Sequence, residues 1–303
     1  MKILLIGCGF IGRHFLQRAA HCGHRVSVLD RRTEHGAVAD ARHETILGDI
    51  RDQGLVQSLV AEFNCVVNLA GLLGTSETID NPMPSIQTNL LGAINVFEGL
   101  RLGAKVTGTP PRCVQISVGN HFMNNTYAVT KSSAERFAFM YNKEHGTEIV
   151  VVRALNAYGP HQKHAPVKKV IPNFVLSALK GEPISVFGSG EQIMDMIYVE
   201  DVADILLRAA TATPIPSNSV IEAGTGRRTT INDIASTVNR LAGSTAGIKY
   251  LPMRPGEPPD SVVVAQTESL QSLGISVGSL TSLEDGLALT INWYRSNYQW
   301  KNS

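Results

Sequence analysis

The chain has 303 residues, of which 43% are hydrophobic and 17% charged, and its formal net charge at pH 7 is +1. This is the composition of a soluble globular protein with room for one large or two modest domains, and the near-neutral charge argues against nucleic acid or a membrane as a partner. The N-terminus lacks the apolar length and cleavage site of a signal peptide, and no uncharged apolar stretch reaches the roughly 18 residues of a membrane-spanning helix, so we expect a cytoplasmic protein.

Apolar runs typical of buried strands alternate with stretches of helical spacing through the first half of the chain. The expected strands are residues 2–6, 25–29, 44–48, 65–70, 113–117 and 148–155. The expected helices follow the first strand up to about residue 22 and then cover residues 52–63, 82–100 and 126–145. Such alternation predicts an α/β protein with a parallel sheet between two layers of helices, and the right-handed crossover rule makes it a Rossmann-type doubly wound fold.

The pattern loosens after about residue 158, where prolines and glycines become frequent. The stretch MRPGEPPD (253–260) is expected to be a loop. We expect residues 1–160 to form a Rossmann-type domain and residues 161–303 to form a smaller C-terminal α/β lobe. Segments around 195–225 are expected to cross back to the first domain.

A glycine-rich turn follows the first expected strand. Gly7, Gly9 and Gly12 form a GxGxxG pattern that also contains Phe10 and Ile11, and it stands between a strand and a helix. That context is what a dinucleotide-binding turn requires. The first glycine allows a tight bend, the second lets the backbone approach a pyrophosphate, and the third permits close packing of helix and strand. The unpaired N–H groups of the helix N-terminus would face the phosphates.

Asp30 stands at the end of the second expected strand, 18 residues after Gly12. A carboxylate there can accept hydrogen bonds from the adenosine ribose and would repel a 2′-phosphate, so NAD is favoured over NADP. Arg31 and Arg32 weaken this preference, because a guanidinium at this point could hold a 2′-phosphate.

Tyr127 and Lys131 are four residues apart in an expected helix and therefore share one of its faces. A phenol with its ordinary pKa of about 10 is a poor acid–base group at neutral pH. A neighbouring ammonium can lower that pKa, and it could also hold a nicotinamide ribose. The pair alone is a weak signal, but it begins the helix after the fifth strand, at the sheet edge where ligands bind. This position favours an acid–base centre.

Several longer stretches resemble one family of enzymes. They are GCGFIG, GDIRD (48–52), NLAG (68–71), NPMPSIQTNLLGAINVFEG (81–99), YAVTK, RALNAYGP (153–160), VIPNF (170–174), YVEDVA (198–203), RPGE (254–257) and LEDGLALTINWY (283–294). Together they make the chain similar, over nearly its whole length, to extended short-chain dehydrogenases/reductases of the NAD-dependent epimerase/dehydratase family, which act on nucleotide sugars.

The resemblance implies roles for the matching positions. Tyr127 would be the acid–base residue, and Lys131 would be its partner and a cofactor contact. Further cofactor contacts would come from Asp49, Ile50, Leu69, Ala70, Gly71 and Asn89. Asn156, His161 and Arg254 would contact the nucleotide-diphosphate sugar, with the Arg254 guanidinium suited to its diphosphate.

The chain departs from the family pattern after the fifth strand, where two hydroxyl residues are usual and the second is catalytic. Here Ser117 fits the first position and Val118 the second. Either Ser117 has taken over, or Thr126 supplies the hydroxyl, or the hydroxyl is absent. We expect Ser117 to act.

The linker before Tyr127 is shorter than is usual in the family and contains no Asp or Glu. Relatives that dehydrate or decarboxylate the sugar carry a carboxylate there, so its absence argues against both reactions. His121, Asn124 or Asn125 could compensate. In the stretch 188–196, Met194 replaces a common phosphate-binding arginine, and His161 stands where an arginine often follows YGP.

These observations favour an NAD-dependent nucleotide-sugar epimerase, most simply a 4-epimerase that oxidises the sugar transiently to a keto sugar and reduces it on the other face. A 4-ketoreductase or a dehydratase of the same family is the alternative enzyme. A dinucleotide-binding sensor without turnover is the alternative from another class. The resemblance also implies a homodimer formed through the helices at 82–100 and 126–145.

Four cysteines are spread along the chain: Cys8, Cys22, Cys65 and Cys113. They form no CxxC and no Cys/His cluster with metal-ligand spacing. We therefore expect small buried thiols in a reduced protein. His161 and His164 form a lone i, i+3 pair, so no metal site is expected.

Overall fold

The central element of the computed structural model is a parallel sheet of seven strands, in the order β11-β6-β5-β4-β1-β2-β3. The model describes residues 1–32, 43–108, 111–216, 219–255 and 258–298, with the side chains of 105–107 left out. The strands are β1 (Lys2–Ile6), β2 (Arg25–Asp30), β3 (His43–Leu47), β4 (Cys65–Asn68), β5 (Arg112–Val118), β6 (Glu148–Ala154) and β11 (Val220–Ala223). The chain reverses its direction of winding between β1 and β4, which is where ligands bind in such sheets. The predicted doubly wound fold is confirmed.

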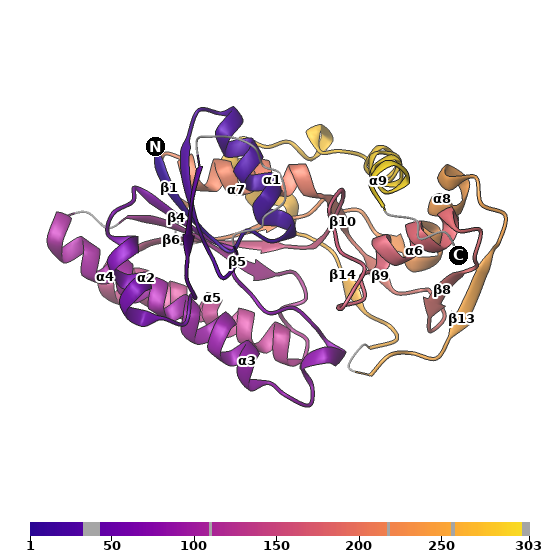
Figure 1. Ribbon diagram of the computed structural model, residues 1–303, viewed down its shortest axis with the longest axis horizontal. Helices are drawn as coiled ribbons and strands as arrows, with labels where there is room; N and C mark the ends of the chain where they lie inside the picture. Colours follow the sequence, from indigo (N-terminus) through magenta and orange to yellow (C-terminus); the bar gives the residue numbers. More distant parts are fainter. Residues whose placement is uncertain (33–42, 109–110, 217–218, 256–257, 299–303) are drawn as a thin grey trace.

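Helices cover both faces of this sheet (Figure 1). On one face lie α1 (Phe10–His21) and α7 (Val199–Thr211), and on the other lie α2 (Gln53–Val60), α4 (Gly92–Thr107) and α5 (Thr126–His145). Successive strand residues point to opposite faces, so Ile3 and Leu5 of β1 join the core under α1 and α7, whereas Leu4 and Ile6 join the core under α2, α4 and α5. The apolar runs of the sequence are therefore buried on both sides.

The helix expected at 82–100 has a different form. It begins as α3 (Met83–Ser85), continues as a π-helix (Ile86–Leu91) and only then becomes α4. The π turn contains Asn89, whose side chain is buried and bonded to the loop after β4. Such wide turns are frequent at functional sites.

A second cluster of elements forms the C-terminal part of the fold, to the right in Figure 1. Its helices are α6 (Val170–Leu179), α8 (Ile231–Ala242) and α9 (Leu283–Asn297), and they share a core with the pair formed by β8 (Ile184–Phe187) and β13 (Ile248–Leu251). Between the two parts, β7 (Asn156–Tyr158) pairs with β10 (Met196–Tyr198), and β9 (Ile193–Met194) pairs with β12 (Thr229–Thr230) and β14 (Val262–Val263). Short 3₁₀-helices lie at Ser76–Thr78, Thr267–Leu273 and Val277–Ser279.

Strand β11 adds to the edge of the central sheet beside β6, although it follows the elements of the C-terminal part in the sequence. The domain limits at residues 160 and 161 stay predictions. In the expected loop at 253–260, the described residues 253–255 and 258–260 form neither helix nor strand, and residues 256–257 lie outside the described part. No helix in the described ranges has both the length and the apolar character needed to cross a bilayer.

Three of the cysteines are buried as expected, but Cys22 is exposed. The prediction for Cys22 was wrong because this residue follows the last turn of α1, where the chain leaves the sheet surface.

Candidate active site

The turn between β1 and α1 needs two of its three glycines for the protein's own packing. Gly7 has a φ of 88°, and a Cβ there would lie 2.8 Å from the Ala70 backbone. A Cβ on Gly12 would lie 2.5 Å from the Gly7 carbonyl oxygen. Gly9 differs, because a Cβ there would meet no described atom within 4 Å and its φ of −78° suits any residue. The open space over Gly9 leaves room for a pyrophosphate to approach the protein backbone, so the turn fits a dinucleotide.

Helix α1 begins at this turn without a side-chain cap, which leaves its first N–H groups for a ligand. Asp30 lies beside the turn and accepts hydrogen bonds from the Cys8 N–H at 2.8 Å and the Arg32 N–H at 3.1 Å. A carboxylate has about four acceptor positions. Asp30 can therefore still accept a ribose hydroxyl, as the sequence predicts.

Arg31 lies near Asp49 on the neighbouring strand connection, with 4.0 Å between its guanidinium and the carboxylate. Asp49 is held more closely by Arg51, at 2.7 Å, and this hydrogen-bonded guanidinium keeps the pKa of Asp49 below its ordinary value. Ile50 is buried and covers Gly92 of α4. The carboxylate of Asp49 thus draws Arg31 toward itself, which supports the preference for NAD.

The loop after β4 is tied to α5 from two sides. The Lys131 ammonium donates to the Ala70 carbonyl at 3.0 Å and lies against Gly71, where a Cβ would come within 3.1 Å of Lys131 Cε. Asn89 accepts from the Leu72 N–H at 2.7 Å and donates to Thr130 Oγ1 at 3.1 Å. These bonds hold the loop that begins at Leu69 against α5. Asn89 thus braces this loop, and its predicted contact with a cofactor stays a prediction.

Tyr127 and Lys131 lie on the first turns of α5, whose N-terminus is capped by Asn125. The Lys131 side chain is only 2% exposed, and burial lowers its pKa to about 8. Burial raises the pKa of Tyr127. In the chain itself the phenol therefore shifts opposite to the predicted direction, because Lys131 points to the Ala70 carbonyl and desolvation dominates at Tyr127.

Between pH 8 and pH 9 the wild-type protein is expected to gain about 1 kcal/mol of unfolding free energy relative to a Lys131→Met variant. The pKa of Lys131 is about 8 in the folded chain and higher in the unfolded chain, so the unfolded state binds more protons over this interval and stability rises with pH. Urea unfolding of both proteins at both pH values measures the difference. Parallel changes in the two proteins would contradict a lowered pKa.

Ser117 is a buried residue at the wall of a cavity. Ser117 is 2% exposed, lines the same cavity as Tyr127, and its Oγ has no hydrogen-bond partner among the described residues. The Thr126 hydroxyl instead donates to the Thr78 carbonyl at 3.3 Å. Val118 also lines the cavity with an apolar surface. Of the two hydroxyl residues considered, Ser117 is the one that belongs to the described cavity lining.

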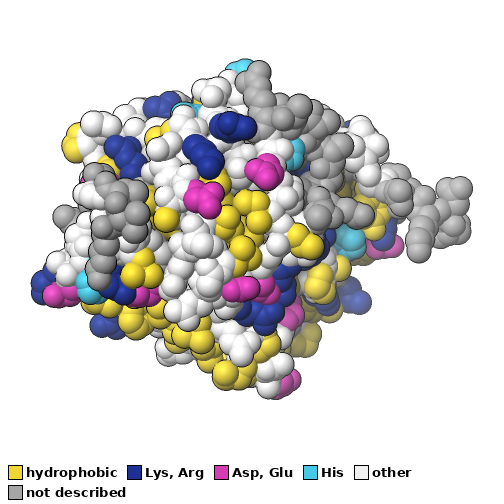
Figure 2. Space-filling model, turned by 60° about the vertical axis from the view of Figure 1, so that its left-hand side comes forward, with side chains coloured by type: hydrophobic (Ala, Val, Ile, Leu, Met, Phe, Trp, Pro, Cys, Tyr) yellow, Lys and Arg dark blue, Asp and Glu magenta, His cyan; other side chains and the backbone are white. Residues whose placement is uncertain are grey.

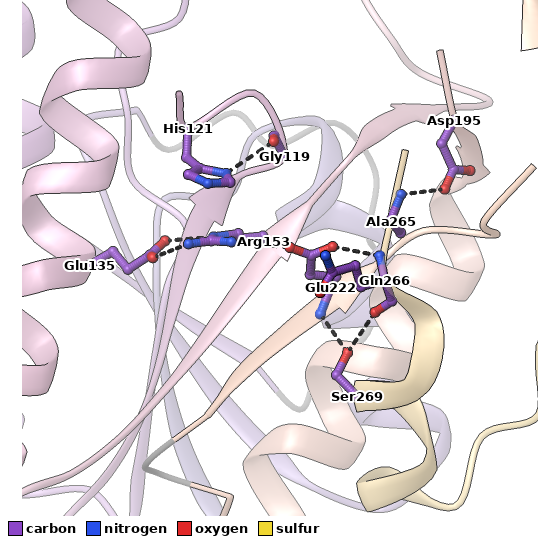
Figure 3. Close-up of polar contacts among 9 residues, drawn as sticks. All are labelled: Gly119, His121, Glu135, Arg153, Asp195, Glu222, Ala265, Gln266 and Ser269. Carbon is purple, nitrogen blue, oxygen red and sulfur yellow. Dashed lines mark hydrogen bonds and ion pairs between the residues drawn. The ribbon is translucent and has the colours of Figure 1, made fainter. Parts of the chain in front are cut away.

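The three linker residues that could compensate for the missing carboxylate are engaged elsewhere or exposed, whereas Asn120 of the same linker lines the cavity. A ring nitrogen of His121 lies 3.2 Å from the Gly119 carbonyl (Figure 3), Asn125 caps α5, and Asn124 is exposed. None of these three belongs to the described lining of the cavity.

A cavity of about 510 Å³ extends from the carboxyl ends of β5 and β6 to the C-terminal part of the fold. Asn156 and Arg254, for which contacts with the nucleotide sugar are predicted, both line it. The Asn156 amide donates to the Asp195 carbonyl at 3.1 Å, and the Arg254 guanidinium lies 5.4 Å from the centre of the Phe187 ring.

The structure does not bring His161 to this cavity. Its backbone has a φ of 67°, and its ring packs against the Trp293 ring with 4.6 Å between the ring centres and 56° between the planes, 5.9 Å from the ring of His14. Burial, together with Arg13 and His14, lowers the pKa of His161 to about 4. The position after YGP therefore serves packing between α1 and α9 rather than the cavity.

Other residues of the cavity wall escaped the sequence analysis: Glu77, Lys168, Lys169 and Gln192. The two lysines directly precede α6, and this position at a helix N-terminus was a signal for an anion site. Met194, which replaces the expected arginine, also lines the cavity.

Behind the cavity, buried charges join the strand ends to α5 (Figure 3). Arg153, in register with Ser117 on the adjacent strand, bonds to Glu135 of α5 at 2.5 Å and to Glu222 of β11 at 3.0 Å. Glu222 in turn accepts from the Gln266 N–H at 2.7 Å. The network fixes α5 relative to the strands that carry the cavity residues. In the part of the chain that is described, no group of three or more His, Cys, Asp or Glu side chains is arranged to hold a metal ion.

Comparison with known proteins places these features in context. A model of the NAD dependent epimerase/dehydratase family matches residues 3–224. The chain is 27% identical to a putative UDP-glucose 4-epimerase of Methanocaldococcus jannaschii, covering 98% of this chain and 99% of that protein. It is 28% identical to the dTDP-glucose 4,6-dehydratase of Streptomyces niveus, covering 99% and 94%. A third relative is the trifunctional protein RHM3 of Arabidopsis thaliana, a UDP-glucose 4,6-dehydratase, 3,5-epimerase and reductase. The match has 27% identity and covers 99% of this chain but only 48% of RHM3, so the chain spans about half the length of that protein.

Solved structures show the same fold. The UDP-glucose 4-epimerase of Thermotoga maritima with UDP-glucose superposes with a TM-score of 0.87 at 26% identity and covers 98% of this chain and 99% of its own. The enzyme WbmF of Bordetella bronchiseptica in complex with NAD+ superposes with a TM-score of 0.84 at 26% identity, covering 98% and 93%.

Proposed function

Because the chain belongs to the NAD-dependent epimerase/dehydratase family, we propose that this enzyme is a nucleotide-sugar epimerase, most simply a 4-epimerase. The observation that carries the proposal is a shared cavity. Tyr127, Ser117 and Asn156 line the same space as Phe10 and Ile11, which begin the helix of the glycine turn. A sugar at the carboxyl ends of the strands would therefore meet an acid–base group beside the cofactor turn.

The residues present fit NAD. The turn from Gly7 to Gly12 would hold its pyrophosphate, Asp30 its adenosine ribose, and Lys131, at the loop from Leu69 to Gly71, the nicotinamide ribose. Bound NAD supplies a reversible two-electron oxidation of a sugar carbon. The open space over Gly9 supports this assignment.

Tyr127 would take the proton of the sugar hydroxyl that is oxidised and return it when the keto sugar is reduced on its other face. In the chain itself Lys131 points to the Ala70 carbonyl and burial raises the pKa of Tyr127, so the ammonium would favour the ionised phenol, one helical turn away, only in the complex with NAD and substrate. Ser117 Oγ donates a hydrogen bond to the reacting sugar oxygen, which gives this buried hydroxyl the partner it lacks within the described chain.

A nucleotide-diphosphate sugar suits the rest of the cavity. Lys168, Lys169 and Arg254 all line it and can face a diphosphate. These three side chains supply the positive charge that is lost where Met194 replaces a phosphate-binding arginine. These contacts support a sugar nucleotide rather than a free sugar as the substrate.

A dehydratase is the second candidate, because one carboxylate does line the cavity. Glu77, in the 3₁₀-helix Ser76–Thr78, is the sole Asp or Glu among the described lining residues. It lies outside the linker in which the sequence analysis sought a carboxylate. Elimination of water from the sugar needs such an acid–base group in addition to Tyr127.

Turnover tests decide between these reactions. The purified protein is incubated with UDP- and dTDP-hexoses, and the products are separated and identified by NMR. A C4 epimer formed without net consumption of NAD supports the proposal. A 4-keto-6-deoxy sugar would support the dehydratase, and stoichiometric consumption of NADH on a keto sugar would identify a 4-ketoreductase. No conversion of any nucleotide hexose would contradict the proposal.

We also propose a homodimer formed through α4 and α5. Exposed apolar side chains follow one face of these helices and the preceding π turn: Leu91, Leu102, Val129, Phe137 and Met140. Figure 2 shows hydrophobic side chains gathered in the lower part of the molecule, where this helical layer lies. Such a contiguous apolar surface is typical of a protein interface. The cytoplasmic location stays a prediction.

Light scattering is expected to give twice the 32.7 kDa of one chain for the wild type and a single-chain mass for Phe137→Glu, because a charge in the centre of an apolar interface is desolvated without a partner. Leu289→Glu, which changes an exposed leucine on α9, is the matched control and should stay dimeric. A monomeric wild type would contradict the proposed dimer.

A further inference from the structure

Asp195 is a fully buried carboxylate in the stretch between β9 and β10. Its Oδ1 accepts hydrogen bonds from the N–H of Thr225 at 2.9 Å and from the Thr225 hydroxyl at 2.5 Å. Its Oδ2 accepts from the N–H of Gly226 at 2.7 Å and from the N–H of Ala265 at 3.2 Å, the bond drawn in Figure 3. A carboxylate has about four acceptor positions, so the chain itself uses all of them and none is left for a ligand.

The backbone of Asp195 binds two further segments. Its N–H donates to the Val263 carbonyl at 2.9 Å, and its carbonyl accepts from the N–H of Asn156 at 3.3 Å and from the side-chain amide of Asn156 at 3.1 Å. Because this carbonyl occupies the amide nitrogen of Asn156, the amide oxygen is the end that remains for a ligand. Asn156 lines the cavity, so Asp195 determines which way a residue of the cavity wall is turned.

These partners lie in segments where the chain crosses between the central sheet and the C-terminal part. The crossing segments are residues 155–156 after β6, 195–198 before α7, 224–226 after β11 and 264–266 after β14. The strands β6 and β11 belong to the central sheet and α7 covers it, whereas β14 belongs to the small sheet between the two parts. Four crossing segments therefore meet at one buried side chain, and its bonds hold them together.

Close packing couples the crossing segments as well. Gly224, directly after β11, has no room for a side chain, because a Cβ there would lie 2.4 Å from Leu155 Cδ2 and 2.5 Å from Ala265 Cβ. The same Cβ would lie 2.7 Å from Asp195 Oδ2. Segments packed this closely do not move independently, since a shift of one forces a shift of the others.

The two walls of the cavity belong to the two parts that the crossing segments join. Ser117 and Tyr127 come from β5 and α5, whereas Phe187 and Arg254 come from the C-terminal part. The bonds between the crossing segments therefore set how far apart the walls lie.

We propose that Asp195 is a positioning residue that holds the two walls of the cavity at a fixed separation and orients Asn156 between them. A nucleotide held by the C-terminal part then presents its sugar to Tyr127 in a reactive position. The effect on catalysis rests on the proposed function, whereas the effect on the separation of the two parts does not.

Distances between two spin labels test the geometry without a substrate. Cys22 is exposed and the other three cysteines are buried, so one label attaches to Cys22 beside the sheet, and Thr245→Cys provides an exposed site for the second in the C-terminal part. Electron–electron double resonance, with excess unlabelled protein to suppress distances between chains, is expected to give one narrow distribution. Asp195→Asn places an amide N–H₂ against the N–H donors and should broaden this distribution. An unchanged width would overturn the inference.

Kinetics test the consequence for catalysis. Asp195→Asn is expected to lower kcat on the nucleotide sugar by about 100-fold, the cost of misplacing reacting groups by about 1 Å. The dissociation constant of UDP and the content of NAD should stay within about twofold of wild type, because each ligand is bound mainly by one part. A merely structural role would not separate binding from turnover in this way. Loss of UDP binding together with kcat would therefore overturn the positioning role.

Val238→Ala is the matched control for a general loss of stability. Val238 is buried in the core of α6, α8 and α9 and is not part of the described lining of the cavity. Its truncation leaves a hole in that core without touching a crossing segment. The control should keep the wild-type distance distribution and a kcat within about twofold of wild type. A kcat that falls as far as in Asp195→Asn would overturn the inference.

Thr225→Val covers the case in which Asp195→Asn does not fold. It removes the hydroxyl bond to Asp195 and leaves the backbone bonds in place, so it should broaden the distance distribution by less. An unchanged distribution in this variant would also overturn the inference. A wild type that converts no nucleotide sugar would overturn the proposed function, and the distance distributions would then decide the inference alone.

Discussion

Replacing Tyr127 by phenylalanine is expected to lower kcat on the nucleotide sugar by about 10²- to 10⁴-fold, the usual contribution of a positioned acid–base group. The substitution removes only the hydroxyl, and the ring continues to fill its place on α5 and line the cavity. The loss should fall on kcat with little change in KM, because the proton is transferred only in the chemical step. Steady-state kinetics and the NAD content of the purified variant measure both effects.

Tyr250→Phe is the matched control. The Tyr250 hydroxyl bonds to Asn232 at 3.2 Å on an exposed part of β13, and the residue does not belong to the described lining of the cavity. Its loss should leave kcat within about twofold of wild type. A Tyr127→Phe variant that behaves in the same way would show that the phenol is not the acid–base group.

The architecture could be predicted because it depends on patterns within short windows of sequence. Apolar runs separated by helical stretches predict the parallel sheet, and the strand and helix around Gly7, Gly9 and Gly12 predict the turn. The π-helix could not be predicted, since it depends on the bonds of one buried side chain, Asn89, with Leu72 and Thr130. Such long-range bonds leave no periodic signal.

The reactive end of the site was predicted more fully than its far wall. Ser117 lies near the end of β5, Asn156 follows β6 and begins β7, and Tyr127 lies on the first turn of α5, so topology alone brings them to one sheet edge. Lys168 and Gln192 reach the cavity from the C-terminal part, whose position over the sheet edge no local pattern specifies. His161 was assigned to the substrate by its place after YGP, but the left-handed backbone at this residue directs its ring to Trp293.

The direction of the Tyr127 pKa depends on burial, which a four-residue spacing does not reveal. The sequence shows that a phenol and an ammonium share a helix face, but it does not show that Lys131 is held by the Ala70 carbonyl. Desolvation then favours the neutral form of both groups, so it raises the pKa of Tyr127 and lowers the pKa of Lys131. Tyr127 and Lys131 therefore need the charges of a bound cofactor and substrate before the phenol can ionise near neutral pH.

Arg153→Ala is expected to lower the free energy of unfolding by about 3–5 kcal/mol, because it leaves the Glu135 carboxylate buried without its cation. The side chains of Arg153 and Glu135 are 16% and 6% exposed, and the guanidinium also bonds to Glu222. Urea denaturation measures the loss. Adding Glu135→Gln to Arg153→Ala should recover part of it, since the uncompensated charge is then removed.

Arg240→Ala provides the matched comparison for this arginine. Arg240 pairs with Glu284 at 3.1 Å, but the two side chains are 58% and 60% exposed, so the same substitution should cost only about 0–1 kcal/mol. Equal losses in the two variants would show that the buried network adds nothing beyond a surface ion pair. A larger loss at Arg153, accompanied by weaker catalysis in the folded protein, would mean that these charges also hold α5, and with it Tyr127 and Lys131, against the strand ends.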